Sequence, residues 1–312
     1  MAQYRKPVPA VRPFLKWAGG KTQLLEEFSS FLPDDMGDGR ITCYTEPFIG
    51  GGAMFFYLNQ KFSFDRCCIY DANEELVLTY RVIKRSVDDL VAELATLKSE
   101  YNKRDERERE SFYYEIRDAF NETLPKIKFR NYSSAWVERA AQIIFLNRTC
   151  YNGLFRVNRK GGFNVPFGRY KKPEILNEMN LRKAAAMLKT TRITLGDFTE
   201  CQRFVDDKTF VYLDPPYRPL NKTSSFVAYS RNGFCDSDQV RLAEFFKKLD
   251  SKGAKVMLSN SDPRNENPHD SFFEDLFGDY YIRRVPARRI INCNGTRRGN
   301  ISELVITNYP VK

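Results

Sequence analysis

The sequence predicts an α/β fold in which a parallel sheet carries helices on its faces and is interrupted by a helical insert. Two features of the chain predict it. Short apolar runs followed by turn or helix signals occur at 41–48 and 66–73, and the same alternation returns from 210 onward. Strands that alternate with helices form parallel sheets. Between about 86 and 189, by contrast, long helical segments dominate.

The elements of the predicted sheet follow in order along the chain. ITCYTEPF at 41–48 leads into IGGGAMFFYL, and RCCIYDAN at 66–73 leads into EELVLTYRVI. Each pair is a buried strand followed by a turn or helix. The second half supplies the strand FVYLDPPY at 210–217, the amphipathic helix DQVRLAEFFKKL at 238–249, and the strands AKVMLSN at 254–260 and ELVITNY at 303–309.

The insert is predicted to be mainly helical. SVDDLVAELATLKSEYNK and WVERAAQIIFLN are helical, and the charge run KRDERERES between them is expected to be a solvated helix face. At 153–170 a Gly-Gly turn separates two short apolar-polar runs, which predicts a β-hairpin. We therefore expect a main domain formed by residues 1–85 and 190–312 and an inserted domain over 86–189.

The charge balance indicates a polyanionic partner. Lys and Arg number 50 against 40 Asp and Glu, a formal net charge of +10. Such a surface favours nucleic acid through phosphate neutralisation, although charge alone does not separate nucleic acid from an acidic membrane. Aromatic residues make up 14% of the chain and could stack on bases or simply fill the core.

Other features argue against several classes of protein. No run of 18 apolar residues occurs and MAQYRKPVPAVRP contains no signal-peptide core, so we expect a cytoplasmic protein without membrane association. The seven cysteines include no CxxC pair, which predicts neither a disulfide framework nor a zinc site. The single histidine, His269, excludes multi-histidine metal sites. We therefore expect no metal.

Two motifs follow the first two predicted strands. Residues 46–52, Glu-Pro-Phe-Ile-Gly-Gly-Gly, lie where a strand ends, and their glycines let a ligand approach the backbone. The spacing is not GxGxxG, and the acidic Glu46 suits a positively charged cofactor better than a diphosphate. Asp71 is placed like a carboxylate that binds ribose hydroxyls. Each motif alone is equally compatible with an ordinary turn after a strand.

The tetrapeptide Asp214-Pro215-Pro216-Tyr217 is more specific. Its prolines fix the backbone and lack N–H donors, which leaves carbonyls free beside a carboxylate and a ring. A planar amine could donate its hydrogens to Asp214 and the Pro215 carbonyl while Tyr217 stacks on the base. The alternative is a rigid turn after a buried strand.

These segments together resemble the DNA adenine-N6 methyltransferases of the Dam type over nearly the whole chain. Residues 14–21, FLKWAGGK, look like the family's N-terminal cofactor motif, 46–52 like its glycine motif and 214–217 like its catalytic tetrapeptide in the alpha-class order. The resemblance implies a Rossmann-like methyltransferase sheet with an inserted helical target-recognition domain. Two departures are the three consecutive glycines at 50–52 and the long charged stretch at 103–110.

The resemblance implies S-adenosyl-L-methionine as the cofactor. Trp17, Ala18, Gly19 and Lys21 would line its methionine end, Asp71 would hold the ribose, Asp197 and Phe198 would border the adenine, and Glu46, Pro47, Phe48, Gly50, Gly52 and Asp214 would complete the pocket. Without the resemblance, Trp17 is expected in the core and Lys21 on the surface.

The segment at 145–170, FLNRTCYNGLFRVNRKGGFNVPFGRY, is similar to the family's target-recognition hairpin. Arg169 matches an arginine that reads guanine, and arginine can bind guanine O6 and N7 through two parallel hydrogen bonds. The other implied DNA contacts are Lys16, Tyr151, Asn152, Leu154, Arg156, Asn164 and Pro166, with Asn294, Thr296 and Arg297 in a C-terminal loop. Arg156, Arg159, Lys160, Lys171 and Lys172 fit phosphate contacts. A solvated basic loop is the alternative.

The sequence therefore predicts a site-specific methyltransferase that acts on a flipped adenine in double-stranded DNA, within GATC by the resemblance. The alternatives are an RNA or protein-glutamine methyltransferase and an inactive DNA-binding homologue; the basic hairpin argues against a protein substrate, and the intact Asp214, Tyr217, Lys21 and Glu46 argue against an inactive protein. We expect a monomer, with a dimer on DNA as the alternative, associated with the nucleoid.

Overall fold

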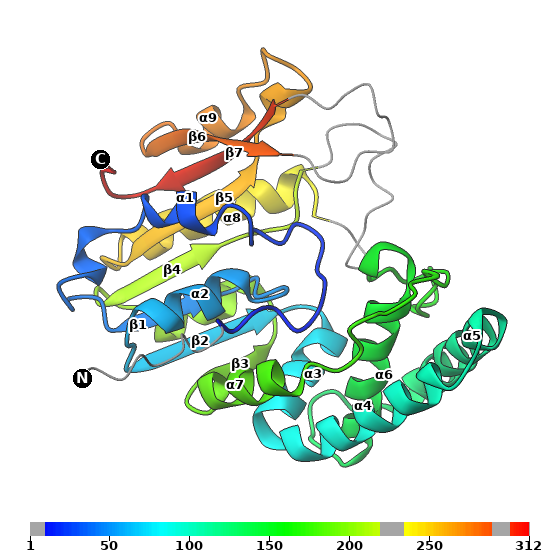
Figure 1. The fold of residues 1–312 in the computed structure, drawn as a ribbon. Coiled ribbons are helices and arrows are strands. Elements are labelled where there is room, and N and C mark those ends of the chain that lie inside the picture. The colour runs from blue at the N-terminus through cyan, green and yellow to red at the C-terminus, as the bar shows by residue number, and fades with distance from the viewer. Residues whose placement is uncertain (1–9, 219–233, 289–299, 312) are drawn as a thin grey trace, which may run out of the picture.

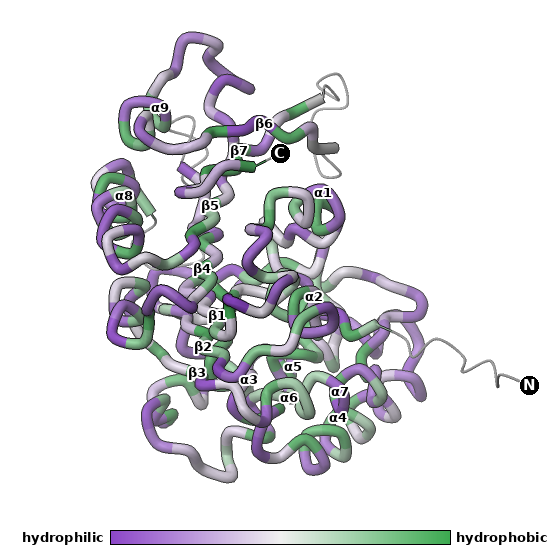
Figure 2. The backbone as a smooth tube through the Cα atoms, turned by 90° about the vertical axis from the view of Figure 1, so that its left-hand side faces the viewer, coloured by the Kyte–Doolittle hydropathy of each residue, from purple (hydrophilic) through white to green (hydrophobic). Residues whose placement is uncertain are grey.

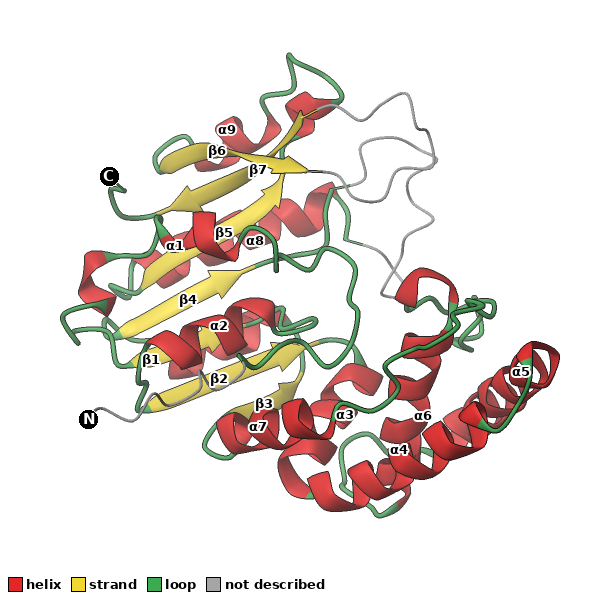
Figure 3. Ribbon diagram, viewed as in Figure 1, coloured by secondary structure: helices red, strands yellow, loops and turns green. Residues whose placement is uncertain are grey.

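The computed structural model describes residues 10–218, 234–288 and 300–311, and a twisted seven-stranded sheet runs through its centre (Figures 1 and 3). The strand order is β3-β2-β1-β4-β5-β7-β6. The strands are β1 (Cys43–Glu46), β2 (Arg66–Asp71), β3 (Arg192–Leu195), β4 (Thr209–Leu213), β5 (Lys255–Ser261), β6 (Tyr281–Arg288) and β7 (Asn300–Thr307).

The predicted parallel sheet is confirmed for β1 to β5. β1 pairs in parallel with both β2 and β4, β2 with β3, and β4 with β5. At the other edge, β7 runs antiparallel to both β5 and β6. β1 and β4 are buried along their whole length, as strands of a parallel sheet covered on both faces must be. The chain order reverses between these two strands, which makes their carboxyl ends the place where such sheets bind ligands.

Helices cover both faces of the sheet. Figure 2 shows α8 and α9 on one side and α1 and α2 on the other, while α3 to α7 gather at the β3 end. The helices are α1 (Leu25–Ser29), α2 (Ala53–Lys61), α3 (Glu74–Arg85), α4 (Val87–Asn102), α5 (Glu106–Thr123), α6 (Ala135–Thr149), α7 (Glu178–Leu188), α8 (Asp236–Asp250) and α9 (Phe272–Phe277). Short 3-10 helices occupy Asp34–Met36, Leu124–Lys126, Tyr151–Gly153, Phe198–Phe204 and Pro263–Asn265.

The predicted insert is helical. The expected helices correspond to α4 and α6, and the charge run forms the exposed start of α5, which begins with a capping box between Asp105 and Glu108. α6 joins α3 through Arg139, whose Nε lies 2.8 Å from Oε2 of the buried Glu75. One apolar core contains both Tyr44 of β1 and Phe145 of α6, so these helices share the core of the sheet. The division into two domains stays a prediction.

The predicted hairpin at 153–170 is shorter than a pair of regular strands. Val157 bridges Phe163 and Cys150 bridges Phe167, both antiparallel and both isolated. Between them, the Asn158 side chain accepts from the backbone N–H of Lys160 and Gly162 and so closes the glycine turn. The segment turns back as predicted, but mainly through loop contacts.

Among the helices that the structure describes, none combines the length and the apolar character that a membrane-spanning helix needs.

Candidate active site

The motifs meet at the carboxyl ends of β1 and β4. Glu46 is the last residue of β1, and Asp214 directly follows β4. Because the two strands are hydrogen-bonded neighbours, the glycine motif and the tetrapeptide lie side by side. The sequence places them 168 positions apart, and the sheet topology brings them together.

Lys21 joins the N-terminal motif to the tetrapeptide. Its Nζ lies 2.6 Å from Asp214 Oδ1 and 3.1 Å from the Gly19 carbonyl, and 4.7 Å from the centre of the Tyr217 ring. The expectation of a surface cation is wrong, because the Lys21 side chain is only 4% exposed. Burial is the largest single effect and opposes its charge, but Asp214, Tyr217 and Glu303 together outweigh burial and raise the pKa of Lys21 above its ordinary value.

Two side chains that the sequence reasoning missed support the tetrapeptide. Ser259 of β5 donates to Asp214 Oδ1 at 3.2 Å. Glu303 of β7 accepts from the Tyr217 hydroxyl, with both carboxylate oxygens 2.9 Å away. Their only sequence signal is a polar residue within an apolar strand. Gln239 of α8 also donates to the carbonyl of Pro216, at 3.3 Å.

Glu46 is buried without a cationic partner among the described residues. Its side chain accepts from the Tyr44 hydroxyl at 2.6 Å, and the residue is 2% exposed. Burial raises the pKa of Glu46 well above its ordinary value, and the nearby charge of Asp214 adds to this effect. A buried carboxyl in this state favours a positively charged ligand. Pro47 next to it is buried as well.

The glycine loop packs tightly against its surroundings. Gly50 and Gly52 have φ angles of +48° and +73°, which glycine adopts without strain. A Cβ on Gly52 would lie 2.5 Å from the Tyr80 hydroxyl, and one on Gly50 would lie 3.0 Å from the Trp17 ring. The packing of the loop therefore favours glycine at positions 50 and 52, and close approach of a cofactor to this backbone stays a prediction.

Asp71 fastens this loop to the end of β2. Its carboxylate accepts from the Gly50 N–H at 3.1 Å and the Asn73 N–H at 2.8 Å. Burial raises the pKa of Asp71 to about 6, although these backbone hydrogen bonds lower it. The carboxylate is therefore held at the strand end, where the sequence predicts ribose binding.

Phe48 and Phe198 stack on each other with ring centres 5.2 Å apart. Asp197, which begins the 3-10 helix at Phe198–Phe204, accepts from Thr199 and forms an ion pair with Arg241 at 3.0 Å. Arg241 also lies over the Phe198 ring, 4.4 Å from its centre. The sequence predicts that Asp197 borders a ligand; the structure shows that its carboxylate already holds Arg241, which the sequence reasoning did not single out.

The chemistry of these donors fits a cationic nucleoside cofactor. Three carboxyl groups, Glu46, Asp71 and Asp214, lie at neighbouring strand ends against one buried cation, Lys21. A ligand with a positive centre and ribose hydroxyls would give these carboxyl groups a positive charge to pair with and hydroxyl donors to accept from. Within the described ranges, no three His, Cys, Asp or Glu side chains are arranged to hold a metal ion.

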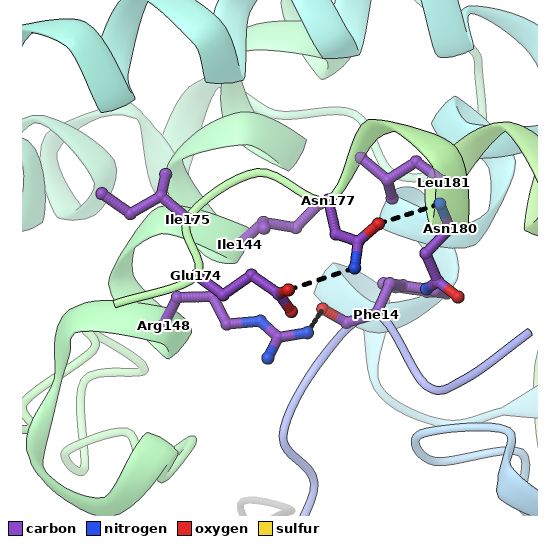
Figure 4. A pocket seen from close by; sticks show the side chains of 8 residues that line it. All are labelled: Phe14, Ile144, Arg148, Glu174, Ile175, Asn177, Asn180 and Leu181. Carbon is purple, nitrogen blue, oxygen red and sulfur yellow. Dashed lines mark hydrogen bonds between the residues drawn. The ribbon is translucent and has the colours of Figure 1, made fainter. Parts of the chain in front are cut away.

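The N-terminal motif is fixed to α6 by hydrogen bonds between side chains of α6 and the backbone of the motif. Asn147 contacts both the N–H and the carbonyl of Lys16 at 2.8 Å, and donates to the Gly153 carbonyl at 2.9 Å. Arg148 donates to the carbonyl of Phe14 at 2.8 Å (Figure 4). The adjoining cavity of about 10 Å³ has room for a single water at most, so this region anchors the motif and holds no ligand. Ala18 and Gly19 remain exposed.

The anchored motif lies directly against the predicted target-recognition segment. Trp17 stacks on Phe155 with ring centres 5.4 Å apart, and Lys16 Nζ lies 4.8 Å from the centre of the Tyr170 ring. Trp17 is half-buried between the Phe155 ring and the glycine loop. It therefore connects the candidate cofactor site with the predicted target-recognition segment.

Several predicted DNA contacts are presented at the surface. Tyr151 is 54% exposed, and Asn152 and Arg169 adopt positive φ angles of 54° and 53°. Arg156 is exposed as well and donates to Asn164 at 2.8 Å. The Pro166 carbonyl accepts from the Tyr151 N–H, Leu154 is half-buried, and the predicted contacts Asn294, Thr296 and Arg297 lie outside the described residues. Backbone strain at exposed polar residues is typical of functional loops.

Comparison with known proteins identifies the family of the chain. The sequence profile of the D12 class of N6 adenine-specific DNA methyltransferases matches residues 17–291. The chain is 51% identical over 300 residues to the type II methyltransferase M.MjaIII of Methanocaldococcus jannaschii, with 96% of this chain and 99% of the relative covered. It is 39% identical to the type II methyltransferase M1.LlaDCHI of Lactococcus lactis subsp. cremoris and 34% identical to the DNA adenine methylase of Escherichia coli K12, with 96% of each chain covered. The chain therefore belongs to the D12 class of N6 adenine-specific DNA methyltransferases.

Proposed function

We propose that this adenine-specific DNA methyltransferase moves a methyl group from S-adenosyl-L-methionine to N6 of an adenine flipped out of double-stranded DNA. The observation that carries the proposal is the meeting of the Lys21–Asp214 pair with the buried Glu46 at adjacent strand ends. The carboxyl of Glu46 suits a cationic cofactor, and the carboxylate of Asp214 suits a planar amine.

The cofactor would be held by groups that the fold has already placed. Glu46 would face positive charge, Asp71 would accept from ribose hydroxyls, and the Phe48 and Phe198 rings would border the adenine. When bound, S-adenosyl-L-methionine supplies a methyl group activated on a sulfonium, which N6 takes directly without a covalent enzyme intermediate.

The target amine would be oriented by Asp214 and Pro215. Lys21 and Ser259 both donate to Asp214 Oδ1, whereas Oδ2 has no hydrogen-bond partner among the residues that the structure describes. Oδ2 and the Pro215 carbonyl can then accept the two N–H groups of an exocyclic amine. Tyr217, held by Glu303, would stack on the flipped base.

The same groups would stabilise the charge that develops during transfer. Methylation leaves positive charge near N6, which the Asp214 carboxylate offsets before the extra proton departs to solvent. Lys21 holds this carboxylate in place through its contact with Oδ1.

The proposed recognition sequence is GATC, which rests on the family resemblance of the YNGLFR and FNVPFGR segments. Arg169 would read guanine, while Arg156 and Lys172 would contact phosphates. We propose a monomer in the cytoplasm, where the nucleoid DNA lies.

The test is transfer of radiolabelled methyl to matched duplexes that contain GATC, GTTC or neither, with single-stranded DNA and RNA as controls. Label confined to GATC duplexes supports both the chemistry and the recognition site. Equal label on all duplexes that contain adenine would contradict the specificity, and preferential label on RNA would contradict the choice of DNA.

A further inference from the structure

A second cavity lies away from the strand ends that form the candidate active site. It has a volume of about 210 Å³ and is lined by Arg81, Arg85, Arg130, Tyr132, Trp136 and Ile193. Arg81 and Arg85 lie toward the end of α3, whose first residues follow Asp71. A helix of 12 residues is roughly 18 Å long, so the cavity and the cofactor side lie at opposite ends of α3.

The cavity is rich in positive charge that has no counterion among the described residues. None of its three arginines forms an ion pair with any residue that the structure describes, and Arg81 donates instead to the carbonyls of Phe129 and Ile193. Burial and the charge of Arg85 lower the pKa of Arg81, and they act in the same direction on Lys84. Within the part of the chain that the structure describes, the cluster therefore lacks a negative partner.

A buried donor in the wall of the cavity also lacks a partner. Trp136 is 1% exposed, and its indole N–H makes no hydrogen bond within the described residues. Buried donors of this kind are almost always paired in folded proteins. Tyr132 packs edge-on against the Trp136 ring, donates to or accepts from Ser86 at 2.6 Å, and lies beneath the Arg85 guanidinium. The wall is therefore held in place by its neighbours.

We propose that this cavity binds a phosphoryl oxyanion. Guanidinium groups bind phosphate oxygens through paired, charge-assisted hydrogen bonds, and the indole N–H adds a neutral donor. The volume is several times the roughly 30 Å³ that a water occupies but below the roughly 300 Å³ of pockets for drug-sized ligands. A single phosphoryl group with its hydration water therefore fits better than a whole nucleotide.

The site is separate from the proposed DNA contacts. α6 begins beside Trp136 and ends at Thr149, next to the 150–170 segment, and its 15 residues extend roughly 22 Å. The phosphoryl group could belong to free phosphate or to the backbone of a DNA long enough to reach this side of the protein. The chemistry of recognition is the same for both.

The test titrates inorganic phosphate into the full chain by isothermal titration calorimetry, with chloride at matched ionic strength as the blank. The cavity variant is Arg85→Gln/Arg130→Gln, in which both residues are exposed and unfolding is not expected. The matched control is Lys248→Gln/Arg283→Gln, which removes the same charge from exposed positions on α8 and β6. Trp136→Phe keeps the ring and removes only the N–H donor.

We expect phosphate to bind at one site, at least ten-fold more weakly to the cavity variant, more weakly to Trp136→Phe, and unchanged to the control. A parallel arm measures the affinity for a short and a long duplex by fluorescence anisotropy. If the cavity variant loses affinity for the long duplex but not for the short one, the occupant of the cavity is a phosphate of the DNA backbone. If the cavity variant and the control behave alike toward both phosphate and DNA, the proposal is wrong.

Discussion

The ammonium of Lys21 lies 2.6 Å from the carboxylate of Asp214, although the two residues are 193 positions apart in the sequence. This ion pair links the loop before α1 to the end of β4. Because the described residues engage only Oδ1 of Asp214, the pair leaves Oδ2 for a substrate.

Glu46→Gln should have opposite effects on stability and on cofactor affinity. The amide keeps the volume and can still accept from Tyr44, but it removes a buried carboxyl that has no cationic partner among the described residues. We expect the free energy of unfolding to rise and cofactor binding to weaken at least ten-fold, measured by urea denaturation and calorimetry. The exposed Glu244→Gln is the control. Unchanged cofactor affinity would contradict a role for the Glu46 charge.

Cofactor affinity should increase as the pH rises from about 5 to about 7. Asp71 has a pKa of about 6, and its ionised form is the better acceptor for ribose hydroxyls. Calorimetry over this range should show a gain of up to about ten-fold, which Asp71→Asn flattens.

The pKa of Asp71 also has a consequence for stability. Because this pKa lies above the ordinary 3.8, protonation of Asp71 stabilises the fold below about pH 4, and this contribution is lost as the pH rises through about 6.

The affinity measurement has its own contradicting outcome. If the affinity of the wild type for the cofactor does not change between about pH 5 and about pH 7, Asp71 does not contact the cofactor.

Gly52→Ala should cost more stability than Gly39→Ala. Both glycines have nearly equal positive φ angles, +73° and +76°, but a Cβ at Gly39 meets nothing within 4 Å, whereas one at Gly52 meets the Tyr80 hydroxyl at 2.5 Å. Backbone strain alone costs about 1–2 kcal/mol, and the clash should add about 1–3 kcal/mol in Gly52→Ala. Urea denaturation compares the two, and equal losses would mean that the loop yields to accommodate the methyl group.

Arg169→Ala should relax the sequence preference of methylation. A bidentate contact to guanine contributes about 1–3 kcal/mol of discrimination, so kcat/KM for the preferred duplex should fall about 5- to 150-fold while that for duplexes substituted at the guanine changes little. Lys172→Ala, at an exposed position nearby, should lower kcat/KM for all duplexes by the same factor. Equal losses on all duplexes in Arg169→Ala would assign Arg169 to phosphate binding.

The sequence alone predicts the strands that are buried on both faces. β1, β2, β4 and β5 are short apolar runs followed by turn or helix signals, and each lies within or close to its predicted range. β3 has only four residues and is half exposed at the sheet edge, so it carries no comparable pattern. β6 contains three arginines and a proline, which conceal a strand formed by pairing with β7.

The sequence predicts members of the candidate site where they lie within one contiguous motif. The tetrapeptide and the glycine loop meet that condition. Ser259 and Glu303 do not, because their contacts with Asp214 and Tyr217 depend on the order of β4, β5 and β7. The burial of Lys21 likewise follows from a long-range ion pair that no local pattern reveals.

The most direct test of the account is methyl transfer by Asp214→Ala, measured beside cofactor binding to the same variant. We predict that transfer to duplex DNA is abolished while calorimetry shows that much of the affinity for S-adenosyl-L-methionine is retained, because Glu46, Asp71 and the glycine loop are unchanged. Substantial methylation by Asp214→Ala would contradict the proposed role of its carboxylate in orienting the adenine amine.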